Sequence, residues 1–103
     1  MSILQSLFGG GKTADLKAVI DEGAFLVDVR TPAEFADGHV QGSVNIPLDR
    51  IASELPRFKG RKNIVVFCRS GARSGQAKAI LEQNGFTNVV NGGSWDDVKR
   101  FVK

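Results

Sequence analysis

Hydrophobic and polar positions along the chain alternate between two kinds of segment. Short apolar runs, typical of buried strands, alternate with stretches in which apolar residues recur every three or four positions, as in amphipathic helices. The apolar runs predict strands at 25–29, 64–67 and 86–90, with a brief strand before Pro47. The helical pattern predicts helices at 13–22, 31–38, 48–55, 74–84 and from Ser94 to the end. This alternation predicts an α/β fold with a parallel sheet and helices on both faces.

Local signals mark where several of these elements begin or end. Thr31-Pro32-Ala33-Glu34 carries a capping residue, a proline at the first helical position and a glutamate at the third, which is a strong helix start. Gly23 and Gly85 are expected to stop the helices that precede them. Gly92-Gly93 is expected to form a turn, after which Ser94 caps the last helix.

Length and composition indicate one globular domain. The 103 residues can bury about two-thirds of their unfolded surface around a single core, and 42% of them are hydrophobic and 24% charged. We expect an N-terminal arm over residues 1–12, with apolar residues at helical spacing, and a domain over 13–103. Because the arm has no basic residue before Lys12 and no long apolar core, it does not resemble a secretory signal, and we predict a cytoplasmic protein without a membrane partner.

Charge is divided unevenly between the two halves of the chain. Residues 1–54 contain eight acids and four bases, whereas residues 55–103 contain three acids and ten bases, with no acid between Glu54 and Glu82. The basic half is not interleaved with aromatic residues and carries no recognised nucleic-acid motif, so nucleic acid is not an expected partner. We expect these charges to favour a small anionic substrate.

The stretch 63–76 carries the strongest chemical signal. Cys68, the only cysteine, ends the predicted strand at 64–67, and a helix follows within a few residues. Gly71 and Gly75 permit a tight turn whose N–H groups, with the positive end of the helix, would converge on an anion at the sulfur. Such surroundings lower a thiol pKa and produce a reactive thiolate, whereas the alternative is an inert core cysteine.

The residues after the cysteine complete the predicted site. Arg69 and Arg73 place two cations beside the sulfur. One cysteine and one histidine do not supply a four-ligand structural zinc site, so we expect no metal. The predicted nucleophile is Cys68, and the predicted substrate-binding residues are Arg69, Ser70, Gly71, Ala72 and Arg73.

Other polar residues have two interpretations each. His39, the only histidine, is a candidate general base for Cys68, but a role in fixing its own loop is favoured. Asp28 could hold a loop by accepting backbone hydrogen bonds, and Arg30 could pair with Glu34. Trp95 is expected to pack in the core, although it could line the cysteine pocket.

The chain carries a series of short motifs: Asp28-Val29-Arg30, Glu34-Phe35, the segment from Gly38 to Pro47, the Cys68 loop, and Gly92-Gly93 with Trp95. In order and spacing, these motifs together resemble a single-domain rhodanese. The resemblance runs from about Thr13 to the C-terminus. It implies a sulfurtransferase with a transient cysteine persulfide, a parallel sheet of about five strands, and no metal or organic cofactor.

The resemblance favours sulfur transfer over two alternatives. In this reading Cys68 takes the sulfane sulfur of an anionic donor such as thiosulfate and passes it to cyanide, a thiol or a protein cysteine. Cysteine-dependent phosphatases of related fold have five residues between cysteine and arginine, whereas four separate Cys68 from Arg73. A non-catalytic interaction or sulfur-relay module is the other alternative, and a non-catalytic module is expected to lack the cysteine.

Overall fold

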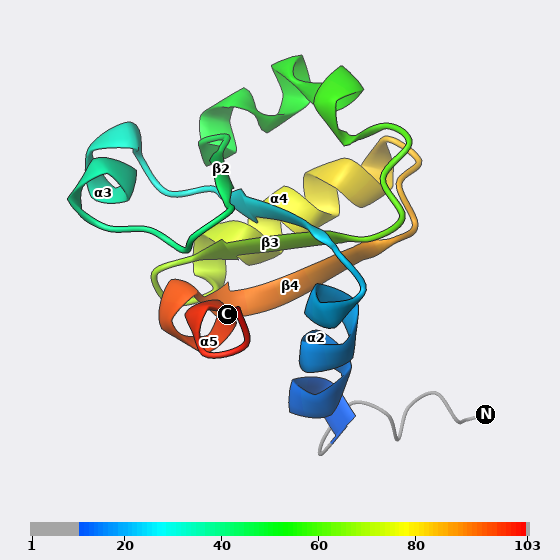
Figure 1. Ribbon diagram of the computed structural model, residues 1–103. Coiled ribbons are helices and arrows are strands. Elements are labelled where there is room, and N and C mark those ends of the chain that lie inside the picture. The colour runs from blue at the N-terminus through cyan, green and yellow to red at the C-terminus, as the bar shows by residue number, and fades with distance from the viewer. Residues whose placement is uncertain (1–10, 103) are drawn as a thin grey trace.

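Four strands form one parallel sheet. The computed structural model describes residues 11–102, with side chains from Leu16 onward. The strands lie in the order β2-β1-β3-β4, and Figure 1 shows them side by side. Their bounds are Phe25–Asp28 for β1, Val44–Asn45 for β2, Ile64–Cys68 for β3 and Val89–Ser94 for β4. The predicted parallel α/β fold is confirmed, with four strands among the described residues where about five were expected.

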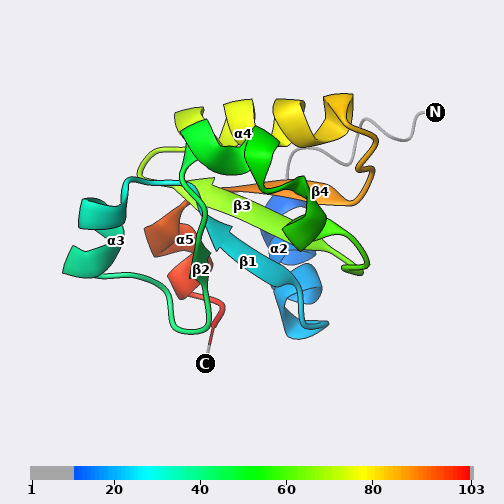
Figure 2. The ribbon, with the colours of Figure 1, turned by 90° about the horizontal axis from the view of Figure 1, so that it is seen from above.

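Helices cover both faces of the sheet, as Figure 2 shows. One face carries α4 and two short 3-10 helices, and the other carries α2 and α5. The remaining helix, α3, lies beyond the carboxyl ends of the strands. The helix bounds are Gly11–Asp21 for α2, Pro32–Asp37 for α3, Leu48–Ser53 for η1, Leu55–Phe58 for η2, Ala72–Gln83 for α4 and Trp95–Lys99 for α5. Among the described residues, no helix has the length and apolarity needed to cross a membrane.

The central strand β3 divides the core into two clusters. All five of its residues are buried, because helices cover the sheet on both sides. Ile64 and Val66 pack into the cluster under α4, and Val65 and Phe67 pack into the cluster under α5. Alternate side chains of a strand point to opposite faces, so this one strand anchors both cores. Its last residue is Cys68, which belongs to the α4 side.

The predicted helix over 48–55 is two 3-10 helices instead. The first ends at Ser53, and Pro56 lies in the first turn of the second, where a residue without an N–H is tolerated. Phe58, which follows, is 1% exposed and makes edge contacts with Phe25 and Phe86 at centroid distances of 5.7 and 6.1 Å. Phe58 stands between Arg57 and Lys59, so a charged segment also supplies a core residue.

The last strand differs from its prediction over 86–90. It starts three residues later and runs through Gly92-Gly93, which does not form a turn. A bulge in the pairing with β3 leaves Gly92 unmatched. A Cβ at Gly92 would lie 2.8 Å from Val98 and 2.9 Å from Val65, so close packing between strand and helix requires a glycine here.

Helix starts were predicted more closely. Thr31 and Glu34 form the expected capping box of α3, and Ser94 accepts a hydrogen bond from the Asp97 N–H at the start of α5. Helix α4 begins at Ala72 and helix α2 at Gly11, each two residues before its predicted start. The apolar arm predicted for residues 1–12 lies almost wholly outside the described residues.

Candidate active site

Cys68 is the last residue of the central strand. Its side chain is buried, and the residues Arg69 to Gly71 join it to helix α4. Gly71 is the residue that precedes the helix, and its φ of 100° is in the left-handed region. Because a side chain would strain that conformation, glycine allows the chain to turn from strand to helix within three residues. The turn folds the loop back over the sulfur.

Hydrogen-bond donors converge on the sulfur. The Gly71 N–H donates to Cys68 Sγ at 3.0 Å, and Ser74 Oγ lies 3.6 Å from it. Burial raises the pKa of the Cys68 thiol, but hydrogen bonds from the Ser74 hydroxyl and from the N–H groups of Ser74, Gly71 and Ser70 outweigh burial, and the pKa is lowered. The loop therefore stabilises a thiolate.

The two arginines beside the cysteine have different surroundings. Arg69 is exposed and lines a shallow pocket of about 380 Å³ together with Trp95 and Glu34. Among residues 16–102, no ion pair involves Arg69. Ser70 and Ala72 are also exposed, so the loop turns these side chains to solvent while its backbone faces the sulfur.

Arg73 is held by a carboxylate. Its guanidinium donates to both oxygens of Glu34, at 2.8 and 3.2 Å, and so ties α4 to α3. This pairing, with the Thr31 hydrogen bonds, lowers the pKa of Glu34 from 4.5 to about 2. The predicted pairing of Arg30 with Glu34 is therefore wrong, because Arg73 occupies that carboxylate. The charge of Arg73 is compensated before any substrate arrives.

A buried ion pair holds the neighbouring loop. Arg30 donates to both carboxylate oxygens of Asp28 and to the Gly38 carbonyl, and its guanidinium lies 4.5 Å from the centre of the Trp95 ring. Asp28 also accepts the Arg30 backbone N–H, which is the loop-holding role predicted for it. Trp95 packs against the core under α5, as predicted. It also lines the pocket with Arg69, but Cys68 is not part of that pocket's lining.

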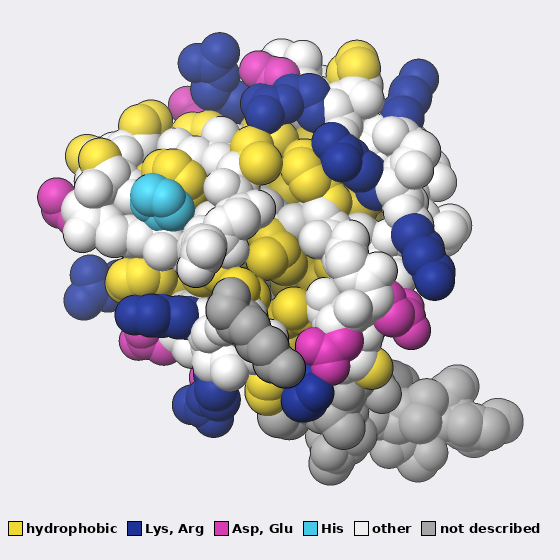
Figure 3. Space-filling model, viewed as in Figure 1, with side chains coloured by type: hydrophobic (Ala, Val, Ile, Leu, Met, Phe, Trp, Pro, Cys, Tyr) yellow, Lys and Arg dark blue, Asp and Glu magenta, His cyan; other side chains and the backbone are white. Residues whose placement is uncertain are grey.

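His39 fixes its own loop. Its Nδ1 lies 2.8 Å from the Phe35 carbonyl oxygen, and its ring stacks on the Phe35 ring at 3.8 Å. It is exposed, and it is the cyan side chain on the surface in Figure 3. Among the described contacts none joins His39 to Cys68, so the general-base hypothesis has no geometric support and the loop-fixing interpretation is confirmed.

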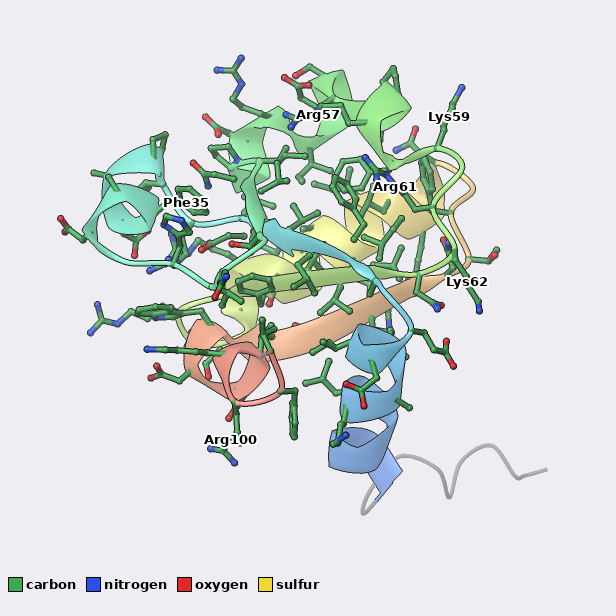
Figure 4. All side chains as sticks on the ribbon, viewed as in Figure 1. Phe35, Arg57, Lys59, Arg61, Lys62 and Arg100 are labelled. Carbon is green, nitrogen blue, oxygen red and sulfur yellow. The ribbon has the colours of Figure 1, made fainter. Side chains whose placement is uncertain are left out.

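Much of the basic charge lies away from the cysteine. Arg57, Lys59, Arg61 and Lys62 precede strand β3, and Figure 4 shows Lys59, Arg61 and Lys62 on the side of the molecule away from helix α3. Near the cysteine, acidic and basic side chains are mixed, because Glu34, Asp37 and Asp96 share the pocket with Arg69. The charge pattern of the sequence therefore overstated the positive charge around Cys68.

The sequence analysis missed Asn91 and gave Ser74 no role. Ser74 is fully buried and contacts the sulfur, and its Oγ lies 2.7 Å from Asn91 Oδ1. A usable signal was present: Asn91 is a polar residue that follows Val89-Val90 directly in an apolar strand. Within the described part of the chain, no group of three His, Cys, Asp or Glu side chains is placed to hold a metal ion.

Comparison with known proteins identifies the family. The family model described as Rhodanese-like domain matches residues 12–100. The chain belongs to the rhodanese-like family. This rhodanese is 40% identical over 74 residues to thiosulfate sulfurtransferase PspE of Escherichia coli, a match that covers 70% of this chain and 71% of PspE. It is 41% identical over 70 residues to a sulfurtransferase of Allochromatium vinosum, covering 68% of this chain and 65% of that protein.

Solved structures agree with these relatives. A rhodanese from E. coli, solved with anions, matches with a TM-score of 0.66 and 39% identity, over 73% of this chain and 91% of that one. The human single-domain sulfurtransferase TSTD1 matches with a TM-score of 0.69 and 28% identity, over 82% and 88% of the two chains. The rhodanese is therefore a sulfurtransferase by family.

Proposed function

We propose that this rhodanese moves a sulfane sulfur from a small anionic donor such as thiosulfate to a nucleophilic acceptor, through a persulfide on Cys68. The observation that carries the proposal is the set of donors aimed at Cys68 Sγ, with the Gly71 N–H at 3.0 Å, which lowers the thiol pKa. A thiolate is the nucleophilic form of cysteine. Thiosulfate as donor is supported by the similarity to PspE, which is named a thiosulfate sulfurtransferase.

The first step loads the cysteine. The Cys68 thiolate attacks the outer sulfur of thiosulfate, a new S–S bond forms, and the S–S bond of thiosulfate breaks, so that sulfite leaves with the electron pair. Arg69, exposed beside the pocket and free of an ion pair among the described residues, attracts the dianionic donor. The loop N–H groups stabilise negative charge on the sulfur before and after transfer.

The second step unloads the cysteine. A nucleophile attacks the outer sulfur of the persulfide, and Cys68 leaves as the thiolate that the loop already stabilises. Cyanide yields thiocyanate, and a small thiol or a protein cysteine yields a new persulfide. Each step exchanges one S–S or S–C bond for another, so no external oxidant, metal or organic cofactor is required.

The phosphatase alternative is disfavoured by the state of Arg73. A phosphatase loop needs its arginine to donate hydrogen bonds to the phosphate oxygens, whereas the Arg73 guanidinium donates to both carboxylate oxygens of Glu34. The loop also has only four residues between Cys68 and Arg73. A purely non-catalytic module would have no use for a buried cysteine with several donors directed at its sulfur.

The test is an intact-mass measurement of the protein after incubation with thiosulfate, beside a Cys68→Ser variant. The wild type should gain about 32 Da, one sulfur atom, and lose it again when cyanide is added, with thiocyanate appearing in the solution. The variant should gain nothing, because it lacks the sulfur nucleophile.

Two outcomes would contradict the proposal. If thiosulfate, 3-mercaptopyruvate and glutathione persulfide all leave the mass unchanged, small-donor sulfur transfer is wrong for this chain. If the protein instead hydrolyses an aryl phosphate and Cys68→Ser abolishes that hydrolysis, the phosphatase alternative is right.

A further inference from the structure

Asn91 lies beneath the cysteine loop, in a fixed orientation. Its Oδ1 accepts the Gly93 N–H at 2.9 Å, and its Nδ2 donates to the Gly71 carbonyl at 3.2 Å. A backbone N–H can only donate and a backbone carbonyl can only accept, so these two contacts determine which end of the amide is oxygen. The oxygen end is therefore the one that lies 2.7 Å from Ser74 Oγ.

The Ser74 hydroxyl has one proton and three acceptors within reach. They are Asn91 Oδ1 at 2.7 Å, the Gly71 carbonyl oxygen at 3.1 Å and Cys68 Sγ at 3.6 Å. Ser74 is completely buried, so solvent does not compete for this proton. The proton must go to whichever neighbour carries the most negative charge, since a hydrogen bond to a charged acceptor is the stronger one.

The charge on Sγ changes during sulfur transfer. In the free enzyme the thiolate places a full negative charge on Sγ, and Ser74 gains most by donating to it. In the persulfide the charge moves to the outer sulfur and Sγ becomes neutral. The Ser74 hydroxyl then needs another acceptor, because an unpaired buried hydroxyl is costly.

We propose that Asn91 is a positioning residue for Cys68. Its amide N–H donates to the Gly71 carbonyl and fixes the loop, and its Oδ1 accepts the hydrogen bond of the Ser74 hydroxyl whenever Sγ is not a thiolate. The persulfide part of this inference rests on the proposed function. Asn91 Oδ1 and Cys68 Sγ compete as acceptors of the hydrogen bond from the Ser74 hydroxyl, so Asn91 affects how strongly the thiolate is stabilised. No covalent bond changes in this step, because only a hydroxyl rotates.

The backbone around Asn91 is built for this close approach. The bulge at Gly92 lies directly after Asn91, and bulges commonly redirect a side chain beside an active site. A Cβ at Gly71 would lie 3.4 Å from the Gly93 Cα, and a Cβ at Gly75 would lie 3.5 Å from Asn91 Nδ2. Strand β4 and the cysteine loop are therefore packed against each other through glycines.

Charged groups also lie on the elements that surround the cysteine loop. Helix α4 contributes Arg73, paired with Glu34 of α3, and the loop contributes Arg69. The end of β1 contributes Asp28, paired with Arg30. Helix α5 contributes Asp97, close to Gly93, and Arg100, which follows α5, pairs with Asp97 and lines a pocket with Gly71 and Asn91. All of these remain in place when only Asn91 is changed, so they are constant across the variants of the test.

The test measures the rate of Cys68 alkylation by iodoacetamide against pH, in Asn91→Asp, Asn91→Ala and the wild type. Asn91→Asp adds a negative charge next to Ser74 and loses the donor to Gly71. The pH midpoint of the alkylation rate should therefore rise by about one unit, which means about tenfold less thiolate at a pH below the midpoint. Asn91→Ala removes the competing acceptor, so the midpoint should fall. Opposite signs are the signature of competition, because simple loosening of the loop moves both variants in the same direction.

The control is the same pair of measurements in a Ser74→Ala background. There Asn91→Ala should no longer shift the midpoint, because the proton that Asn91 competes for is gone. Asn88→Asp, an equivalent charge change at the other end of β4, should leave the midpoint near that of the wild type. If Asn91→Asp does not fold, the Asn91→Ala and Ser74→Ala cycle alone decides.

Two results would overturn the inference. Either both Asn91 variants shift the midpoint in the same direction, or the shift of Asn91→Ala persists without the Ser74 hydroxyl. Alkylation needs no sulfur donor, so it separates this inference from the proposed function. A protein that shows the opposite shifts but gains no sulfur from thiosulfate would keep the Asn91 role and lose the sulfurtransferase proposal for that donor.

Discussion

Arg69 and Arg73, the two arginines beside the cysteine, differ in their charge partners. Arg73 is compensated by Glu34 in a two-point ion pair, whereas Arg69 stands exposed beside the pocket. An anionic donor that approaches Cys68 therefore meets Arg69, which has no ion pair among the described residues, and the carboxylates of Glu34, Asp37 and Asp96. The balance between Arg69 and Glu34 should set how tightly a small dianion is held.

Changing either charge should move donor binding in opposite directions. Arg69→Gln should raise the KM for thiosulfate about fivefold, and Glu34→Gln should lower it by a similar factor, because one unit charge at about 4 Å in water is worth about 1 kcal/mol. Steady-state kinetics with cyanide as acceptor measure both. The kcat should change little, since neither side chain touches the transferred sulfur.

Two variants at the far end of the molecule serve as controls. Lys62 and Glu22 pair with each other at 4.0 Å. They precede β3 and β1 and so lie at the amino ends of these parallel strands, whereas Cys68 is at the carboxyl end of β3. Lys62→Gln and Glu22→Gln should leave the KM unchanged. Equal effects of the near and far substitutions would mean that the overall charge, and not the Arg69–Glu34 balance, controls donor binding.

At the residue scale, the sequence predicted what depends on neighbours along the chain. The place of Cys68 at the end of a strand and the capping box at Thr31 follow from local patterns, and both are found. Glu34, the partner of Arg73, lies 39 residues away from it in the sequence, and Asn91 lies 17 residues from Ser74. No local sequence pattern indicates either contact, so only the folded chain reveals them.

At the element scale, the bulge in β4 is the feature that brings strand and cysteine loop together. It sits at Gly92, where the strand is packed between Val65 on β3 and Val98 on α5. The sequence predicted a turn here because Gly-Gly is a common turn pair. A glycine required by close packing and a glycine required by a turn look the same in a sequence.

A methyl group at Gly92 should therefore destabilise the protein. In Gly92→Ala the Cβ would lie within 3.0 Å of two valine side chains, so we expect a loss of about 1–3 kcal/mol in the free energy of unfolding, as for other overpacked cores. Urea denaturation measures the loss.

Gly75→Ala is the matched comparison. Its new Cβ meets nothing closer than 3.5 Å, and it sits inside helix α4, where alanine is favoured over glycine by about 1 kcal/mol. This variant should be as stable as the wild type or more stable. A Gly92→Ala protein of unchanged stability would show that the valines yield without cost, and that the bulge does not depend on glycine.

On the scale of the whole molecule, helix α3 depends on a charged contact. None of its residues is buried, and the Glu34–Arg73 pair ties it to α4. The pKa of Glu34 is lowered to about 2, so the folded state holds the ionised carboxylate more strongly than the unfolded chain does. A group with a depressed folded pKa contributes stability above its unfolded pKa and loses it as the pH falls toward the folded pKa.

The stability lost in Glu34→Gln should depend on pH in a defined way. The difference in unfolding free energy between wild type and variant should be constant above about pH 4.5 and shrink as the pH falls toward about 2, because Glu34 becomes protonated over that window. Urea denaturation at a series of pH values measures it. Glu54, whose ion pairs are longer at 3.8 and 4.0 Å, provides the matched glutamine variant and should show a smaller change. A difference that stays constant down to pH 2 would contradict the lowered pKa.

The overall architecture was the most predictable level. Alternating apolar runs and helical patterns are enough to predict a parallel sheet with helices on both faces. They also place the cysteine at the carboxyl end of the central strand. The exceptions are segments in which charged residues surround a buried apolar residue, so that the sequence pattern does not indicate its burial. The charges of residues 57–62 concealed Phe58, which closes the core under α4.

The loop holds its sulfur mainly with peptide groups and the buried Ser74, and this affects how the protein can evolve. Arg69, Ser70 and Ala72 point outward, so their side chains are free to vary while the N–H groups and the nucleophile stay in place. New donor preferences can therefore arise by substitution at these three positions without rebuilding the reaction centre. A library randomised there should yield many folded, alkylatable proteins that differ in the sulfur compounds they accept.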